Sequence, residues 1–140
     1  MLERLLIAGI LLALGCTAYR FYCWNQIKRL ASRNTGNDRI LSRLQPGIPA
    51  IVYFTTPGCI PCKTVQQPTL ARLHDEFGID HLQIIQIDAT EDTESADQWG
   101  VMSAPTTFIV DQRGITRMVN HGVADQNKLK QQLSTLQTAS

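Results

Sequence analysis

The sequence predicts an α/β domain, with a central mixed β-sheet flanked by helices, that follows an N-terminal transmembrane helix. Compact apolar runs rich in β-branched residues alternate with segments of helical apolar spacing, which favours parallel strands. A turn signal between the last two runs adds an antiparallel hairpin. Residues 5–19 are almost entirely apolar. We therefore predict a membrane anchor at 1–24, a basic and polar linker at 25–38 and a folded domain at 39–140.

The first half of the domain should contain a short helix, a strand and a long helix. Residues 39–45 could form one amphipathic helix, which Pro46 would end. Residues 50–55, AIVYFT, are typical of a strand that is buried on both faces. After the cysteines, residues 63–78 carry apolar side chains at helical spacing, namely Val65, Leu70, Leu73 and Phe77. Pro68 should kink this helix because it has no backbone N–H.

The second half of the domain should alternate strands and helices and close with a hairpin and a helix. We expect, in order, a strand at 82–88, a short helix from about Thr90 to Gly100, a strand at 106–111, a turn at 112–114, a strand at 115–120 and a helix at 125–137. In this order, the strands that alternate with helices should be parallel, and the last two strands should pair antiparallel as a hairpin.

The N-terminal segment has the composition of a membrane-spanning helix. Residues 5–19 carry no charge, and with the aromatic segment that follows the stretch reaches about 20 residues, enough to cross a bilayer. Its end carries side chains that favour the membrane interface, namely Tyr19, Phe21, Tyr22 and Trp24. Arg20 can extend its long side chain to the headgroups. Since the segment has no polar face, we do not expect it to be a core helix of a soluble domain.

Other fates of this segment remain open. A cleaved signal peptide needs a basic start and small residues at the cut, whereas MLER is weakly basic and aromatic residues follow the apolar run. A lipoprotein signal would end at Cys16, because LALGC resembles a lipobox. Most Lys and Arg side chains near the span follow it, so the positive-inside rule favours a single-pass protein with its domain in the cytoplasm. The alternative is a signal-anchor with the domain outside.

The charge distribution argues against nucleic-acid binding. The net charge of +1 divides into +5 over residues 1–45 and −4 over residues 46–140. The basic charge thus belongs to the N-terminal third and not to the domain, where no basic stripe with aromatic residues occurs. Four cysteines are too few for a small disulfide-stapled protein, and a chain of 140 residues can bury a core without them.

Cys59 and Cys62 form a CxxC motif between the strand at 50–55 and the helix that follows. Backbone N–H groups at a helix N-terminus stabilise a thiolate, so the first cysteine should be the nucleophile. Cys62 lies one turn into the helix, should be less exposed, and can attack a mixed disulfide formed at Cys59. Pro61 suits the first turn because it has no N–H to satisfy.

Two other chemistries of paired cysteines fit less well. A structural zinc site needs four ligands, usually a second CxxC or a histidine pair. The other two cysteines lie in the apolar N-terminal segment, and the three histidines do not have such a spacing. Covalent haem attachment needs CxxCH, but Lys63 follows Cys62. We expect redox chemistry with no metal and no bound cofactor.

The domain resembles the thioredoxin family over about residues 39–137. The motifs that carry the resemblance are YFTTPGCIPCK, WGVMSAPTTFIVD and NHGV. The resemblance implies a Cys59–Cys62 disulfide, and a cis peptide bond at Pro105 that faces it. It also implies that the Ala104 backbone binds an extended substrate segment, in a groove flanked by Gly122. Gly58, Ile60, Pro61 and Lys63 would support the active site.

The chain also departs from the family pattern around the cysteines. Gly58 stands where thioredoxins usually have Trp, and Ile60 where they have Gly. Tyr53 replaces a buried Asp that assists proton transfer to the second cysteine, and Ile84 replaces its partner Lys. Lys63 is the nearest cation in the sequence. Because of these replacements, proton transfer should differ from that in a typical thioredoxin.

These observations predict a membrane-tethered thiol–disulfide oxidoreductase. Its partners would be protein thiols or disulfides and an upstream dithiol donor. One alternative is a binding or scaffold module that keeps the fold without redox turnover. Another is a reductase for cytochrome maturation, which would need the domain outside the cytoplasm.

Overall fold

The computed structural model describes residues 14–18 and 39–138. The chain divides into two units, residues 1–33 and 34–140. Within the first, the described residues 14–18 are helical and Cys16 is exposed. Most of the predicted anchor and the whole linker therefore lie outside the described residues. Within the described ranges, every helix is too short or too polar to cross a membrane.

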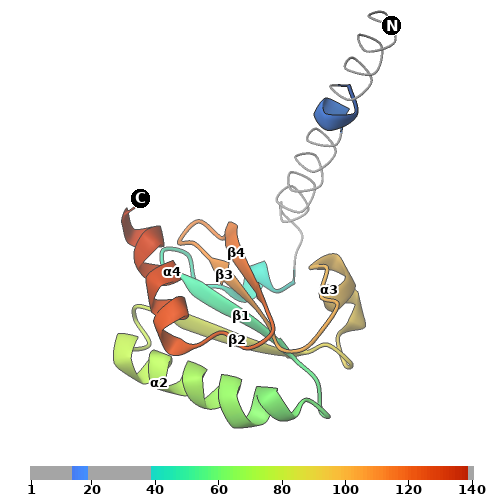
Figure 1. The fold of residues 1–140 in the computed structure, drawn as a ribbon. Coiled ribbons are helices and arrows are strands. Elements are labelled where there is room, and N and C mark those ends of the chain that lie inside the picture. Colours follow the sequence, from blue (N-terminus) through green and yellow to red (C-terminus); the bar gives the residue numbers. More distant parts are fainter. Residues whose placement is uncertain (1–13, 19–38, 139–140) are drawn as a thin grey trace, which may run out of the picture. The chain divides into compact units, whose positions relative to one another are not determined.

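The second unit is built on a four-stranded mixed sheet (Figure 1). Its strands are β1 (Ala50–Thr55), β2 (Gln83–Asp88), β3 (Thr106–Val110) and β4 (Thr116–His121), in the order β2-β1-β3-β4. The β1 strand pairs parallel with β2 and antiparallel with β3, and β3 pairs antiparallel with β4. The predicted strands and the mixed sheet are confirmed. The central strand β1 is buried at all six residues.

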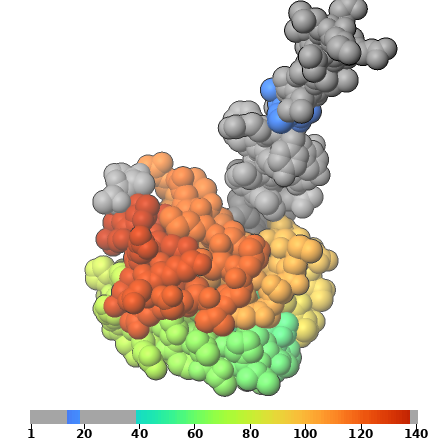
Figure 2. All heavy atoms as spheres, viewed as in Figure 1, coloured from blue at the N-terminus to red at the C-terminus, as the bar shows by residue number. Residues whose placement is uncertain are grey.

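Helices cover both faces of this sheet. On one face, α2 (Gln67–Phe77) and α4 (Gln126–Thr138) lie side by side (Figures 1 and 2). They are joined by an ion pair of 2.6 Å between Lys130 and Glu76. Alternate residues of β1 face each layer: Ile51 and Tyr53 pack with α2 and α4. Ala50, Val52 and Phe54 pack with α3 (Thr93–Gln98) and with Trp99, whose ring contacts two core phenylalanines.

Two predicted helix boundaries are wrong. The segment 39–45 contains only a 3-10 turn, Leu41–Arg43, because the chain must become extended ahead of Pro46 and too few residues remain to nucleate an α-helix. The helix predicted near Thr90 begins at Thr93. The Asp88 carboxylate accepts hydrogen bonds from the Thr90 backbone and hydroxyl, at 2.8 and 2.6 Å, which holds that residue in a turn. Asp92 then caps the helix.

The irregularity predicted at Pro68 is a π-helical turn just before it. Residues Cys62–Gln66 are π-helical and α2 continues from Gln67, whose N–H donates to the Cys62 carbonyl. Within this turn, a polar residue and not the apolar one faces the core. Val65, which the apolar pattern placed inside, is 45% exposed, whereas Gln66 is fully buried.

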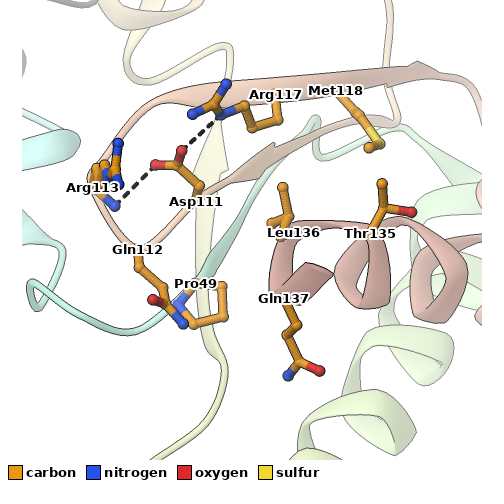
Figure 3. A pocket seen from close by; sticks show the side chains of 9 residues that line it. All are labelled: Pro49, Asp111, Gln112, Arg113, Arg117, Met118, Thr135, Leu136 and Gln137. Carbon is orange, nitrogen blue, oxygen red and sulfur yellow. Dashed lines mark hydrogen bonds and ion pairs between the residues drawn. The ribbon is translucent and has the colours of Figure 1, made fainter. Parts of the chain in front are cut away.

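A hollow of about 230 Å³ lies beside the β3–β4 turn (Figure 3). It is at the end of the sheet remote from the cysteines, because Val110 pairs with Ala50, the first residue of β1. Asp111 organises the turn: its carboxylate accepts from the backbone N–H groups of Arg113 and Ile115 and from the Arg117 side chain at 2.7 Å. Burial opposes ionisation of Asp111, but these hydrogen bonds outweigh it and hold its pKa below the ordinary value.

Asp111→Asn should destabilise the domain by about 1–2 kcal/mol near neutral pH, because the ionised acceptor of three hydrogen bonds is lost. A lowered carboxyl pKa contributes stability above the unfolded-state pKa of about 3.9 and loses it as the pH falls through the folded value. The deficit of the variant should therefore shrink in acid. Denaturant unfolding at about pH 7 and about pH 3 measures it. The exposed Asp80→Asn is the control, and an equal deficit at both pH values would contradict a role for the charge.

Candidate active site

Cys59 and Cys62 form a disulfide where β1 passes into the helix, with their Cα atoms 5.3 Å apart. After Thr55 the chain makes a turn, closed by a hydrogen bond of 3.1 Å from the Cys59 N–H to the Thr56 carbonyl, and the helix begins at Ile60. Cys59 is 8% exposed and Cys62 is fully buried. Cys59 is therefore the more accessible of the two cysteines.

The Cys59 sulfur lies at the amino end of the helix. The Cys62 backbone N–H donates to Cys59 Sγ at 3.2 Å. A hydrogen bond of this kind, together with the helix dipole, favours negative charge on sulfur. The geometry therefore suits Cys59 to nucleophilic attack and to departure as a thiolate.

A second segment beside the disulfide contains Ala104 and Pro105, joined by a cis peptide bond. Ala104 packs in the same apolar cluster as both cysteines. The Pro105 carbonyl accepts a hydrogen bond of 2.8 Å from the Gly122 N–H, which ties the two loops together. Gly122 has φ +83°, a backbone conformation that only glycine adopts without strain.

The residues flanking the cysteines are mostly exposed. Gly58, Ile60, Pro61 and Lys63 all lie at the surface. Met102, in the loop before Ala104, is 93% exposed, and Val123 beside Gly122 is also exposed. A Cβ atom built on Gly58 would meet no atom within 4 Å beyond its chain neighbours, so there is open space at this position. His121 is an exposed residue at the end of β4, paired in register with Thr106.

Tyr53 is completely buried in the apolar cluster that contains both cysteines. Within the part of the chain that the structure describes, no group hydrogen-bonds its hydroxyl. Burial raises the pKa of this phenol, and the nearby Thr55 hydroxyl offsets the effect only in part. Because its ordinary pKa is already about 10, Tyr53 stays protonated near neutral pH and cannot serve as a base there.

The family model for Thioredoxin matches residues 35–135. This match covers most of the chain and includes every element of the site. The chain belongs to the thioredoxin family. The Cys59–Cys62 disulfide is the redox-capable group that the thioredoxin fold presents. Together they support a thioredoxin-like disulfide oxidoreductase.

Individual thioredoxins match over shorter stretches. Thioredoxin of Bacillus subtilis is 44% identical over 57 residues, which are 41% of this chain and 53% of that protein. Thioredoxin 1 of Synechococcus elongatus is 30% identical over 66 residues, which are 47% of this chain and 60% of that protein. The chain thus matches little more than half the length of these relatives.

Solved structures show the same fold at low identity. The thioredoxin of Fasciola hepatica superposes with a TM-score of 0.56 at 23% identity, over 65% of this chain and 83% of that one. A thioredoxin-2 of the malaria parasite superposes with a TM-score of 0.59 at 17% identity, over 66% and 86%. These likenesses support the thioredoxin fold of the second unit.

The sequence did not point to Gln66 as a site residue. Its side chain leaves the helix beside Cys62 and hydrogen-bonds both backbone groups of Ala124. Polar residues at helical positions normally face solvent, so the pattern favoured Val65 for the core. One signal was present: Val65 and Leu70 are five residues apart, a spacing that an α-helix does not place on one face. Gln66, four residues before Leu70, takes the inward position instead.

Tyr53→Phe should stabilise the oxidised protein by about 1 kcal/mol, because it removes a buried hydroxyl that lacks a partner. The effect of pH follows from the raised phenol pKa. Below about pH 10 the Tyr53 phenol is protonated in both the folded and the unfolded protein. Above that pH the phenol ionises in the unfolded protein before it does so in the folded one, which stabilises the unfolded state. Wild-type stability should therefore fall in alkali more steeply than that of the variant. Denaturant unfolding measures both effects, and a destabilised Phe variant would reveal a hydrogen-bond partner.

Proposed function

We propose that this chain is a membrane-tethered oxidoreductase that exchanges disulfides with protein substrates. The observation that carries the proposal is the Cys59–Cys62 disulfide at a helix N-terminus, in which Cys59 keeps a small exposed fraction and Cys62 has none. A disulfide at such a position can be opened by a partner thiolate at the outer sulfur. The residues 1–24 would hold the domain at the membrane surface.

In the reducing direction, the Cys59 thiolate attacks a substrate disulfide. A bond forms between Cys59 and one substrate sulfur, and the other substrate sulfur leaves as a thiolate. The Cys62 thiol then loses its proton and attacks Cys59 Sγ, which forms the internal disulfide and releases the second substrate thiolate. Two electrons pass from the dithiol to the substrate. An upstream dithiol donor restores the dithiol by the reverse steps.

The exit of the Cys62 proton distinguishes this chain from a thioredoxin with a buried acid. Tyr53 occupies the position beneath the cysteines and stays protonated near neutral pH, because burial raises its pKa. We propose that solvent, rather than a buried carboxylate, takes this proton. Lys63 is exposed on the first helical turn and supplies the positive charge nearest to the cysteines in the sequence.

The surface around the disulfide fits an extended apolar segment. Three exposed apolar side chains belong to the segments of the site: Ile60 follows Cys59, Met102 precedes Ala104 by two residues, and Val123 follows Gly122. We propose that the Ala104 backbone pairs with such a segment, between the Pro105 loop and Gly122, in the manner of strand addition. Apolar contacts at this rim would favour substrates whose disulfide lies in an unfolded or edge segment.

Trapping separates the roles of the two cysteines. The full-length Cys62→Ser variant should accumulate mixed disulfides through Cys59, because no second thiol resolves them, whereas the matched Cys59→Ser variant should trap few. Gel electrophoresis without reductant measures the adducts.

Alkylation gives a second test of the two roles. Limiting iodoacetamide should label Cys59 first in the reduced wild type, as mass spectrometry of peptides would show. Preferential labelling of Cys62 would reverse the assignment. If a redox titration of the chain finds no reversible two-electron couple, the chain is a scaffold and not an oxidoreductase.

Membrane attachment requires its own test. The full-length chain should stay in the membrane fraction after an alkaline carbonate wash, whereas a matched chain that begins at residue 25 should be released. Mass spectrometry of the retained protein should find the N-terminus of the uncleaved chain. A lipid-bearing N-terminus at Cys16 would support the lipoprotein alternative. Release of the full-length chain by carbonate would contradict both.

A further inference from the structure

We propose that Gln66 is a positioning residue for the active site: it fixes the substrate-binding loop at Gly122 against the helix that carries Cys62. This inference rests on the proposed disulfide exchange, because it concerns how a protein substrate is held during that reaction. It assigns a function to a buried polar side chain that the thiol chemistry does not use.

The Gln66 carboxamide pairs with both backbone groups of one residue. Its Nε2 donates to the Ala124 carbonyl at 3.2 Å, and its Oε1 accepts from the Ala124 N–H at 2.8 Å. Both residues are fully buried. A side-chain amide that satisfies a buried N–H and a buried C=O together acts as the partner that a neighbouring strand would otherwise supply. Removing it leaves two buried backbone groups unpaired.

This amide pair closes a chain of contacts around the disulfide. Ala124 lies two residues after Gly122, and the Gly122 N–H donates to the Pro105 carbonyl at 2.8 Å. Ala104, next to Pro105, packs with the two cysteines. The segment from Gly122 to Ala124 is thus held on one side by Pro105 and on the other by Gln66. Its position relative to Cys62 therefore depends on the Gln66 side chain.

The π turn links Gln66 directly to the second cysteine. The turn runs from Cys62 to Gln66 and is closed by the bond from the Gln67 N–H to the Cys62 carbonyl. Both Cys62 and Gln66 are buried, whereas the residues between them are exposed. Single π turns occur often at functional sites, where they reorient one side chain without ending the helix. Here the turn ends at Gln66, whose carboxamide binds the segment that follows Gly122.

Binding of a protein substrate should therefore depend on Gln66, whereas the thiol reaction itself should not. A protein substrate would contact the Pro105 and Gly122 loops, so a displaced loop should weaken its binding. A small disulfide reaches Cys59 without those contacts. Loss of the amide pair should therefore raise KM for a protein disulfide and leave kcat and the reaction with a small disulfide unchanged.

The test compares insulin and oxidised glutathione as substrates of the full-length chain in detergent, with a dithiol as reductant. Gln66→Met keeps the length of the side chain and removes both hydrogen bonds. We expect its KM for insulin to rise about five- to tenfold, from the loss of two buried hydrogen bonds, with kcat/KM for oxidised glutathione within about twofold of wild type. Equal losses on both substrates, or no change on either, would overturn the proposal.

Gln83→Met is the matched control. Gln83 also joins its carboxamide to backbone groups, those of Gln45 and Ile48, but at the start of β2, which pairs with the first residue of β1 and lies away from the cysteines. This variant should lose stability without a rise in KM for insulin. If it shows the same rise as Gln66→Met, general destabilisation explains the effect and the positioning role is wrong.

A conservative variant provides a rescue that a structural role alone would not predict. A protonated carboxyl can both donate and accept, so Gln66→Glu should bind insulin poorly at about pH 8 and approach wild-type KM at about pH 5, when burial keeps the acid neutral. The KM of the variant for insulin is compared with that of wild type at the same pH. The reaction of both proteins with oxidised glutathione at that pH is the control. No recovery in acid would contradict the proposal.

Hydrogen exchange of the Ala124 amide gives a readout that does not depend on catalysis. In wild type this buried N–H should exchange slowly, and in Gln66→Met it should exchange at least about tenfold faster. If the wild-type chain reduces neither substrate, the proposed function fails, whereas unchanged Ala124 exchange in the Met variant defeats the Gln66 proposal alone.

Discussion

The burial of β1 along its whole length constrains the rest of the structure. Each of its residues faces one helical layer or the other, so a slip of one position would exchange two sets of core side chains. The register with β2 and β3 is therefore fixed, and so is the point at which the strand ends. Cys59 follows that point by four residues. The reactive sulfur thus takes its position from a strand that is buried throughout and paired on both sides.

Around this fixed point, the site is completed by segments distant in sequence. The Pro105 loop precedes β3 and the Gly122 loop follows β4. Because these strands pair antiparallel, the two loops meet at the same end of the sheet. Pairing of strands brings the loops to the disulfide, but it does not hold their outer parts. That requires side chains, of which Gln66 is the clearest case, since it spans 58 positions of sequence.

Most of the fold and the reactive pair could be predicted because they follow from patterns of neighbouring residues. Runs such as AIVYFT mark buried strands, and the CxxC motif marks the thiols. The start of α3 was misplaced because a side-chain turn at Asp88 competed with the helix. Gln66 was missed because its partner is 58 positions away in sequence, and because the prediction assigned apolar Val65 to the core although polar Gln66 has the α-helical spacing of four residues from Leu70.

The π turn also affects how this chain is compared with its relatives. Such a turn holds one residue more than the α-helical turn it replaces, as its hydrogen bond spans five residues rather than four. Against a chain whose helix is regular here, equivalent positions in α2 are offset by one when counted from the second cysteine. An alignment must therefore open a single-residue gap between Cys62 and Gln67. Without that gap, each core leucine of α2 would be matched to the solvent-facing neighbour of its true counterpart.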